Sequence, residues 1–251
     1  FSGVPAAMLR QFIDTPRLLA DGCVLDRDES HHLIRVLRVT PGDAVEGFDG
    51  AGIIRLLRVA RVSKNEVGLE PAGVPVARPR PACAITLFVC ISKGNRMDWT
   101  VEKAVETGAS RIVPVLSART VVRLDAQEGI DKRMRWERVA REAARQCGAA
   151  WVPRIEAPLT CDASAALVAE AAPVLVGALR PNTPLLREAL AALPERPKQA
   201  GWFVGPEGDF TPDELDRLIA AGAIPVALGG LVLRAETAAL YGLCVIGSRW
   251  L

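Results

Sequence analysis

Three side chains near the end of the chain are of types that handle protons and anions: Glu207, Arg234 and Glu236. Glu207 stands in Gly205-Pro-Glu-Gly-Asp209, and the other two stand in Leu233-Arg-Ala-Glu-Thr237. A carboxylate can accept a proton, and an arginine can bind a phosphate or a developing negative charge. An ion pair between Arg234 and Glu207, with no chemical role, is the alternative interpretation. The local sequence does not choose between them.

Both segments lie where a strand is expected to lead into a helix. The apolar runs 202–205 and 223–228 predict strands, and a capping box with proline in its first turn, Thr211-Pro-Asp-Glu214, predicts a helix start. Residues 237–250 predict the last helix. Two adjacent glycines after the second strand let the backbone pass close to a ligand. A bare loop between a strand and a helix is typical of a site for a small polar or nucleotide-like ligand, so we expect the two loops to build one site.

A third segment, Ser92-Lys-Gly-Asn-Arg-Met97, follows the apolar run 83–91. If that run is a strand of a parallel sheet, Lys93 and Arg96 lie at the carboxyl edge of the sheet, where ligands bind in such folds. A solvated loop is the alternative. Dinucleotide, P-loop and nucleophile-elbow fingerprints are absent from the sequence, which argues against dehydrogenase, kinase and hydrolase activities.

The composition predicts a globular protein with an uneven charge distribution. Half of the 251 residues are hydrophobic and the net charge is +2. Residues 76–150, however, carry 14 basic and 8 acidic side chains. Most of these basic residues are arginines, which suit contact with phosphates and bases. The alternative is a solvated helix face.

The cysteines and the apolar runs bear on location and cofactors. Six cysteines are spaced irregularly, without a Cys-x-x-Cys pair, so we expect neither a disulfide framework nor a metal site. Cys83, Cys90 and Cys244 lie in apolar runs and are expected in the core. No apolar run reaches the roughly 18–20 residues of a membrane span, and residues 1–10 do not resemble a signal peptide. We expect a cytoplasmic protein that contacts no membrane.

The chain is expected to form two domains. Residues 1–73 predict short strands and turns around one helix at 28–38, with Asp28 as its N-cap. Four prolines within 71–81 predict a linker. From residue 82 onward strands and helices alternate, which indicates an α/β fold with a mostly parallel sheet and helices on both faces. Two of its helices, 96–107 and 132–146, are expected to end before a glycine, at residues 108 and 148.

Taken in order, these motifs resemble the bacterial 16S ribosomal RNA (uridine-N3) methyltransferase family, which belongs to the SPOUT class of knotted, S-adenosylmethionine-dependent enzymes. Each motif alone is weak, but the ordered set runs nearly from end to end and is specific. The matching segments are Arg10-Gln-Phe12, His32-Leu-Ile-Arg-Val-Leu-Arg38, Phe48-Asp-Gly50, Ser92–Met97, Glu102-Lys-Ala-Val-Glu-Thr-Gly108, Glu142-Ala-Ala-Arg-Gln-Cys-Gly148, Gly205–Gly208, Leu228-Gly229 and Leu233–Thr237.

The resemblance implies a fold, a reaction and partners. It implies a PUA-like RNA-binding β-barrel at 1–73 and a SPOUT methyltransferase domain with a trefoil knot at 82–251. It implies methyl transfer from S-adenosylmethionine to N3 of a specific uridine in 16S ribosomal RNA, as naked RNA or in the small subunit. It also implies a homodimer with its RNA site near the subunit interface. No metal is expected.

For this reaction we hypothesise that Arg234, or an arginine from the N-terminal domain of the partner subunit, stabilises the developing charge on uracil, and that Glu207 or Glu236 accepts the proton. The resemblance also assigns residues to the binding sites. The residues expected at S-adenosylmethionine are Leu179, Gly205, Pro206, Glu207, Gly208, Leu228, Gly229, Leu233 and Arg234. The residues expected at RNA are Arg10, Arg35, Arg38, Lys93 and Arg96.

Three positions depart from the family pattern. Asp209 stands where the family usually has a second glycine, and Gly230 and Leu231 stand where it usually has proline and arginine. These departures keep two alternatives open: an RNA-binding protein without methyltransferase activity, and a methyltransferase of the same class with another RNA target. A metabolic enzyme that binds a nucleotide at the sheet edge is a third alternative, against which the basic middle segment argues.

Overall fold

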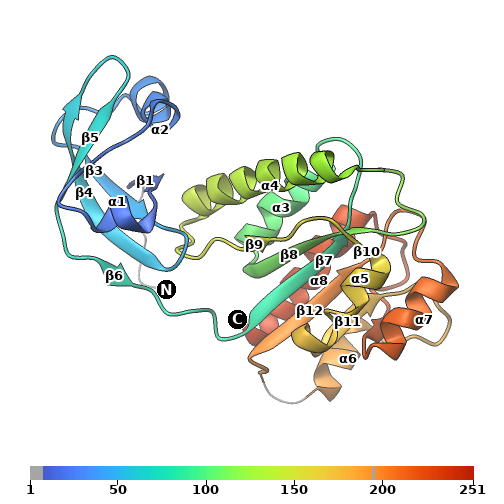
Figure 1. The fold of residues 1–251 in the computed structure, drawn as a ribbon. Helices are drawn as coiled ribbons and strands as arrows, with labels where there is room; N and C mark the ends of the chain where they lie inside the picture. Colours follow the sequence, from blue (N-terminus) through green and yellow to red (C-terminus); the bar gives the residue numbers. More distant parts are fainter. Residues whose placement is uncertain (1–7, 194–195) are drawn as a thin grey trace. The chain divides into compact units, whose positions relative to one another are not determined.

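The structure is a computed structural model that describes residues 8–193 and 196–251. The chain forms two compact units, coloured along the sequence in Figure 1. The first comprises Phe1–Arg80 and Ala144–Val152, and the second comprises Pro81–Ala143 and Pro153–Leu251. The predicted domains, 1–73 and 82–251, did not assign the segment 144–152 to the first unit. The expectation about a signal peptide rests on residues 1–10, of which residues 1–7 lie outside the described residues.

The first unit is built on one sheet. Its strands follow the order β1 (Leu9–Phe12), β3 (Ala44–Phe48), β4 (Ile53–Val62), β5 (Val67–Pro71) and β2 (Cys23–Val24), with β6 (Val76–Ala77) paired to β4. Strands β1 and β3 are parallel, and the other pairs are antiparallel. The predicted linker therefore contributes a two-residue edge strand, which its flanking prolines do not interrupt.

The expected helix of the first unit has another start and another form. Helix α2 (Arg27–His31) begins after Asp26, which forms a capping box with Glu29, so the prediction of Asp28 as N-cap is wrong. The chain then widens into a π-helical turn, η1 (His32–Val36), with a hydrogen bond from the Leu37 amide to the His32 carbonyl of 3.2 Å. Leu33 of this turn is fully buried, and a short helix α1 (Thr15–Leu19) packs beside the same core.

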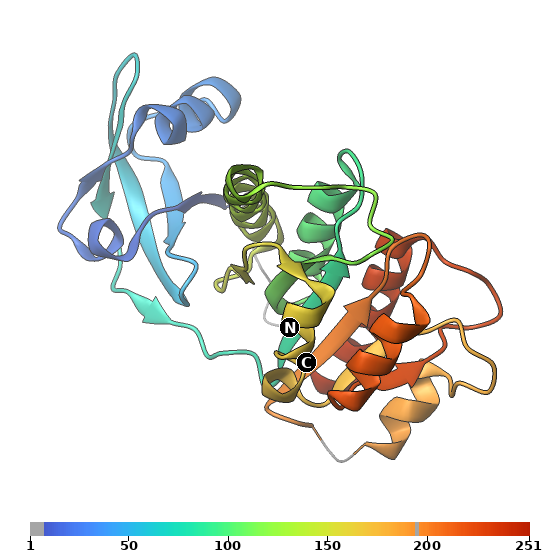
Figure 2. The same ribbon diagram turned by 45° about the vertical axis from the view of Figure 1, so that its right-hand side comes forward.

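The second unit contains a parallel sheet, as predicted. The strand order is β10 (Leu159–Thr160), β8 (Ala109–Leu116), β7 (Ala84–Cys90), β12 (Gln199–Val204), β11 (Val174–Gly177) and β13 (Ile224–Val226), with β9 (Arg154–Ile155) paired to β8. Helices cover both faces, as Figures 1 and 2 show. They are α3 (Arg96–Glu106), α4 (Ala126–Cys147), α5 (Cys161–Ala165), η2 (Ala169–Ala171), α6 (Leu186–Ala192), α7 (Pro212–Ala220) and α8 (Ala235–Trp250).

Alternating residues of the strands bury both faces of this sheet. On β12, Phe203 faces the layer of α5 and α7, where it stacks on Phe88 with ring centroids 4.9 Å apart. Its neighbour Trp202 faces α8 and lies so close to Gly242 that a Cβ there would be 2.2 Å from the indole. Only glycine fits at that position of α8, so the helix is held tightly against the middle of the sheet.

The local signals at helix ends act as predicted. Thr211 and Glu214 form a capping box at the start of α7. Helix α3 ends before Gly108, and α4 ends before Gly148, and both glycines have a positive φ, of 86° and 83°. These are the left-handed positions that follow a helix C-terminus and favour glycine.

Strand β13 is bound on both of its sides by the segment that leaves β11. On one side the Ala178 amide donates to the Val226 carbonyl at 3.0 Å. On the other side the Ala227 amide donates to the Pro184 carbonyl, and the Leu186 amide donates to the Ala227 carbonyl, both at 2.9 Å. The chain from residue 178 to residue 184 therefore leaves on one side of β13 and returns on the other.

The cysteines are free thiols, and the structure sorts them by burial. Cys83, Cys90 and Cys161 are buried, whereas Cys147 and Cys244 are exposed, so the prediction of Cys244 as a core residue is wrong. Burial raises the pKa of Cys90 and of Cys161 to about 12, and that of Cys83 to about 11. A raised pKa means little thiolate near neutral pH, and the thiolate is the reactive form.

We expect iodoacetamide at pH 8 to label the native protein quickly at Cys147 and Cys244 only. Cys83, Cys90 and Cys161 should be alkylated at a comparable rate only after unfolding in urea, because both burial and the raised pKa suppress their reaction. Peptide mass spectrometry after timed quenching measures each site separately. Labelling of Cys90 in the native protein as fast as that of Cys244 would contradict this packing.

Candidate functional site

A hollow lies beyond the carboxyl ends of β11, β12 and β13. It holds about 640 Å³ of empty space, part of it open to solvent. Its lining comes from three chain segments that follow these strands, within residues 177–179, 204–209 and 226–235. Trp202 and Ala238 complete it from the sheet and from α8. The carboxyl edge of a parallel sheet is where ligands bind in this class of fold, and the volume suits a small ligand.

Most of the residues expected at a cofactor lie in this lining. They are Leu179, Gly205, Pro206, Glu207, Leu228, Gly229 and Leu233. Two expected residues are not part of it. Gly208 directs its carbonyl to Arg119 instead, and Arg234 is the exposed N-cap residue of α8.

Sequence reasoning missed other lining residues, because their patterns are those of core residues. Trp202 is fully buried inside β12, and its indole N–H donates to the Ala238 carbonyl at 3.2 Å. Val226 and Ala235 are also buried. A local sequence pattern does not show that a buried strand residue and a helix residue meet at a pocket.

The chemistry of the lining is mostly apolar and main-chain. Its only charged side chains are those of Glu207 and Asp209, within the described residues. Leu231 and Val232, in the loop that also lines the hollow, are 80% and 75% exposed. Apolar side chains can pack against the faces of a flat heteroaromatic ring. Backbone amides and carbonyls can form hydrogen bonds with the edge of that ring, as the edge of a nucleobase does in a base pair.

Arg96 links the two candidate acids. Its Nη1 atom lies 2.9 Å from Oε1 of Glu207, and its Nε atom lies 4.0 Å from Oε1 of Glu236. The suggested alternative pairing of Glu207 with Arg234 is therefore wrong. The Arg234 side chain forms no ion pair within the described part of the chain. Lys93, on the same loop as Arg96, is exposed.

Glu236 has an unusual environment for a carboxylate. Its side chain is only 14% exposed, and its Oε2 atom is buried without a hydrogen-bond partner among the described residues. A buried acceptor left unpaired costs about 1–3 kcal/mol, so such an atom calls for an explanation. One explanation is that the Oε2 atom of Glu236 accepts a proton or a hydrogen bond during function.

The arginines expected at RNA in the first unit differ in role. Arg10 is a structural residue: it pairs with Glu46 at 2.7 Å, donates to the Ala144 carbonyl at 2.7 Å and stacks on Phe48. Its side chain is 10% exposed, so the expectation of RNA contact at Arg10 is not supported by its geometry. Arg35 and Arg38 are exposed.

The loop between β12 and α7 is held by specific contacts. Arg119 donates from Nη1 to the Gly208 carbonyl at 2.7 Å and to the Phe210 carbonyl at 3.3 Å. A Cβ at Gly205 would lie 3.1 Å from the Phe210 ring, so a larger residue there would displace the loop. Asp209 has φ of 59°, in the left-handed region, which explains why a glycine suits this position.

Substitutions at Asp209 test this backbone conformation. Asp209→Gly should stay within about 1 kcal/mol of the original stability. It relieves the strained φ but loses the bond to the Phe210 amide and adds freedom to the unfolded chain. Asp209→Val should be about 1–2 kcal/mol less stable than Asp209→Gly, because a β-branched residue tolerates positive φ poorly. Urea unfolding monitored by circular dichroism measures both. Equal stability of the two variants would contradict the assigned conformation.

Within residues 8–193 and 196–251, no group of three or more histidine, cysteine, aspartate or glutamate side chains is placed to hold a metal ion. No helix of that part of the chain is long and apolar enough to cross a membrane.

Two family models match the chain. The RNA methyltransferase domain family matches residues 78–247, and the RNA methyltransferase PUA domain family matches residues 25–71. Among curated proteins, ribosomal RNA small subunit methyltransferase E from Mycobacterium tuberculosis is 34% identical, covering 95% of this chain and 92% of its own length. The protein of that name from Synechocystis is 31% identical, covering 96% of this chain and 78% of its own length.

Solved structures agree with these matches. A protein from Legionella pneumophila in complex with the bound cofactor SAM has a TM-score of 0.88 at 26% identity, covering 97% of this chain and 98% of its own. Ribosomal RNA small subunit methyltransferase E from Neisseria gonorrhoeae, bound to S-adenosyl methionine, has a TM-score of 0.86 at 27% identity with the same coverage.

Proposed function

This chain belongs to the family of ribosomal RNA small subunit methyltransferase E, and from that premise we propose that it transfers a methyl group from S-adenosylmethionine to N3 of a uridine in 16S ribosomal RNA. The hollow beyond β11, β12 and β13 carries the proposal. The names of the relatives supply the small-subunit RNA, and the resemblance of the motifs supplies uridine N3. Substrates of this kind place the protein in the cytoplasm.

The fold belongs to the proposal as well: a SPOUT trefoil knot in the second unit and a PUA-like barrel in the first, with domains at 82–251 and 1–73. Support for the knot comes from the two-sided binding of β13. Residues 178–186 pass from one side of Val226 and Ala227 to the other, and the chain then continues from Leu228 into α8. Helix α8 packs on β7 and β12, on the far side of β11 in the sheet order. This is the arrangement expected of a chain whose end is drawn through its own loop.

The residues of the hollow fit S-adenosylmethionine. The apolar side chains of Trp202, Val226 and Leu233 suit an adenine ring, and the main chain at Gly205 and Gly229 suits its polar edge. Asp209 and Glu207 are acceptors for ribose hydroxyls or an amino group. When bound there, S-adenosylmethionine supplies an electrophilic methyl group.

The chain's own residues must hold the uracil ring and remove its N3 proton. The base has to be unpaired, because its Watson–Crick edge is the reacting edge. Arg234, exposed at the start of α8, is the cation that stabilises the developing negative charge. We favour Glu236 as the proton acceptor, because its Oε2 atom has no hydrogen-bond partner among the described residues, whereas Glu207 is bound by Arg96 and half exposed. Glu207 lines the hollow and helps to position the ligand.

Mapping the methylated base tests the reaction. The protein is incubated with labelled S-adenosylmethionine and with either naked 16S RNA or small subunits that lack the modification. We expect one N3-methyluridine, located by nuclease digestion and mass spectrometry. Methylation of a carbon atom or of a transfer RNA would overturn the assignment. Calorimetry with S-adenosylmethionine distinguishes the proposed methyltransferase from an inactive RNA-binding protein, because the inactive protein would not bind S-adenosylmethionine.

Single-turnover rates at saturating S-adenosylmethionine test the acids. Glu236→Gln should lower the rate at least 100-fold, the lower end of general-base effects, and Glu207→Gln should lower it less. Glu102→Gln is the matched control, since Glu102 is 45% exposed and paired with Lys103, much as Glu207 is 44% exposed and paired with Arg96. Near-normal rates in both variants would exclude a carboxylate base at either position.

A homodimer is part of the proposal. Exposed apolar side chains of the second unit support it, on the loops around the hollow and on α8: Leu179, Leu231, Val232 and Tyr241. Light scattering should give about twice the 26.9 kDa of one chain. Tyr241→Glu should lower that mass, whereas Val74→Glu should not. Val74 is a control because it is an exposed apolar residue of the first unit, 78% exposed against 44% for Tyr241. A single-chain mass for the original protein would contradict the dimer.

A further inference from the structure

The loop that brings Glu207 and Asp209 to the hollow has a specific internal conformation. The Asp209 amide donates to the Pro206 carbonyl at 2.9 Å, which closes a tight turn. Asp209 itself has a φ of 59°, and its Oδ1 atom accepts from the Phe210 amide at 2.8 Å. These bonds lie within the loop, so they do not by themselves fix its position relative to the sheet.

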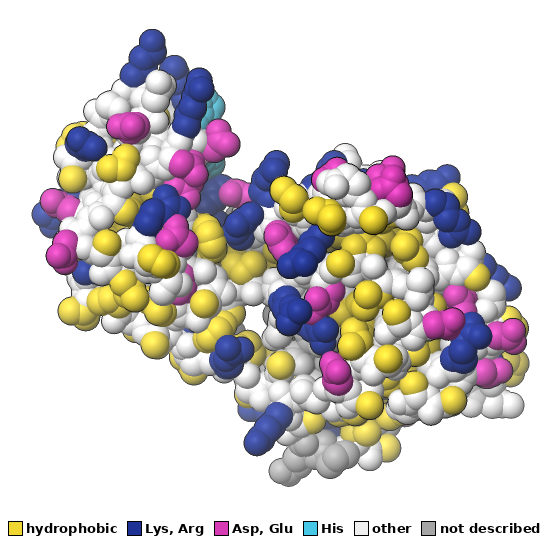
Figure 3. Space-filling model, viewed as in Figure 1, with side chains coloured by type: hydrophobic (Ala, Val, Ile, Leu, Met, Phe, Trp, Pro, Cys, Tyr) yellow, Lys and Arg dark blue, Asp and Glu magenta, His cyan; other side chains and the backbone are white. Residues whose placement is uncertain are grey.

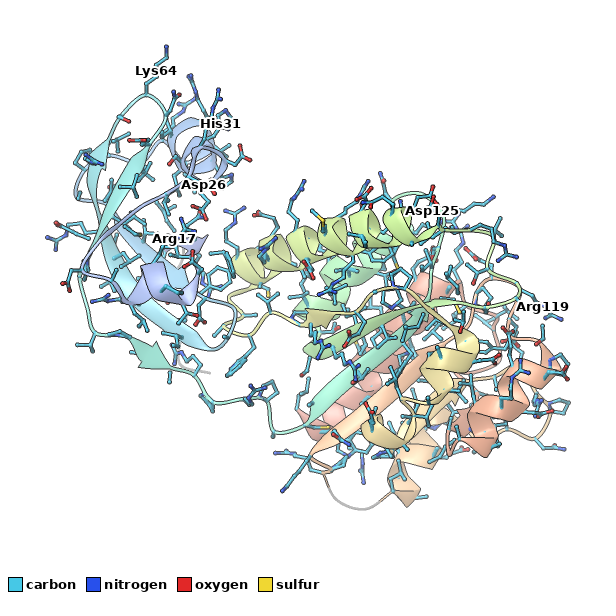
Figure 4. All side chains as sticks on the ribbon, in the orientation of Figure 1. Arg17, Asp26, His31, Lys64, Arg119 and Asp125 are labelled. Carbon is cyan, nitrogen blue, oxygen red and sulfur yellow. The ribbon has the colours of Figure 1, made fainter. Side chains whose placement is uncertain are left out.

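A side chain from another segment supplies that link. Arg119 stands 89 positions before Gly208, and Figure 4 labels it on the loop between β8 and α4. Its Nη1 atom donates to the Gly208 carbonyl at 2.7 Å and to the Phe210 carbonyl at 3.3 Å. A Cβ added at Gly208 would be 3.5 Å from Cδ and 3.6 Å from Cβ of Arg119. Both the stem and the tip of this arginine therefore contact the loop.

The segment that carries Arg119 is itself firmly held. Ser117 and Thr120 are buried and form a turn, in which the Ser117 amide donates to the Thr120 hydroxyl at 3.0 Å. The Ala118 amide donates to Oε1 of Glu214 at 2.7 Å, and Glu214 is a buried residue of α7. A carboxylate that accepts a main-chain N–H forms a strong, charge-assisted bond. Arg119 thus extends from a rigid base to the loop of the hollow.

The surroundings of Arg119 are not a basic patch. Around α7, Arg180 pairs with Asp216 and Arg217 pairs with Asp162, both at 2.8 Å. Figure 3 shows dark-blue and magenta side chains intermixed on this side of the second unit. A surface of mixed sign attracts a polyanion weakly at long range. The two carbonyl bonds, and not a contact with RNA, are therefore the role that the geometry of Arg119 supports.

We propose that Arg119 is a positioning residue, which holds residues 205–210 in the conformation that binds the ligand of the hollow. Arg119 does not line the hollow, so it acts on the ligand only through the loop. If only a fraction of the molecules has the competent loop, the apparent dissociation constant rises by the inverse of that fraction. Saturating ligand restores the competent loop. The identification of the ligand as S-adenosylmethionine rests on the proposed function, whereas the contact between Arg119 and the loop does not.

Two substitutions separate the donors of Arg119 from its stem. Arg119→Met keeps an unbranched stem and removes both hydrogen bonds, whereas Arg119→Lys keeps a cationic donor. Calorimetry with S-adenosylmethionine, without RNA, should give a dissociation constant at least about tenfold higher for Arg119→Met, and within about threefold of the original for Arg119→Lys. In methylation assays of Arg119→Met, KM for S-adenosylmethionine should rise in proportion, while kcat stays within about threefold of the original.

Hydrogen exchange of the ligand-free protein tests the loop directly. Peptides that cover residues 205–210 should exchange faster in Arg119→Met, because the Asp209 amide loses its protection when the turn opens. Peptides of β12 and α8 should exchange as in the original protein, and thermal unfolding verifies that the variant is folded.

Arg55→Met is the matched control. Arg55 likewise donates from one Nη1 atom to two main-chain carbonyls, those of Leu18 at 3.0 Å and Ala20 at 2.8 Å, but it does so in the first unit. This variant should leave the dissociation constant for S-adenosylmethionine and the exchange of residues 205–210 unchanged, whatever its effect on the stability of the first unit.

The outcomes separate this proposal from the proposed function. An unchanged dissociation constant in Arg119→Met would overturn the positioning role. A lowered kcat with an unchanged KM would also overturn it, in favour of a contact with RNA or with the reacting groups. If the original protein did not bind S-adenosylmethionine, the proposed function would fail. Faster exchange of residues 205–210 in Arg119→Met would then still support the positioning role, and equal exchange would overturn it.

Discussion

Hydrogen bonding on both sides of β13 is the constraint on which the rest of the site depends. Val226 and Ala227 are bound by Ala178 on one side and by residues 184–186 on the other. Because the two flanking segments are continuous in the chain, the loop between them must pass around the strand. That geometry places the exits of β11 and β13 side by side, next to β12, and forces their three loops to share one hollow.

Close packing behind the hollow keeps these loops in place. Trp202 presses against Gly242 on one side of the sheet, and Phe210 presses against Gly205 on the other. Arg119 ties the carbonyls of Gly208 and Phe210 to the loop after β8. The main-chain groups of the hollow cannot change rotamer to meet a ligand, so these supporting contacts are what fix their positions.

The three residues that depart from the family pattern differ in how much the structure around them depends on their identity. Asp209 takes the left-handed conformation that glycine would take, and its side chain bonds to the next amide. Within the described residues, no atom lies within 4 Å of the place where a Cβ would stand at Gly230, so packing there does not require glycine. Leu231 is 80% exposed, and it puts an apolar side chain at the rim of the hollow, where the resemblance leads us to expect an arginine. Arg234 remains as an exposed arginine at the start of α8.

What could be predicted from the sequence was local. Continuous apolar runs located strands β7, β12 and β13 of the parallel sheet, and the capping box of Thr211 and Glu214 located the start of α7. Gly108 and Gly148 marked helix ends for the same reason, since a left-handed residue is a property of one position. The ordered motifs then identified the loops, and seven of the nine expected cofactor residues line one hollow. Even local signals failed where two acids competed, and Asp26 rather than Asp28 caps α2.

The sequence by itself thus determined which segments are strands, helices and bare loops, because short-range sterics and hydrogen bonds decide those. Only the tertiary structure decided which charges meet. Arg96 and Glu207 are separated by 111 positions, and their pairing depends on how the strands are ordered in the sheet. The same holds for Arg10, whose guanidinium pairs with Glu46 inside the first unit. It also holds for Lys64, which lies on the turn between β4 and β5 and lines the same hollow of the first unit as Arg35. Contacts between distant segments are set by packing of the whole fold, which no local pattern records.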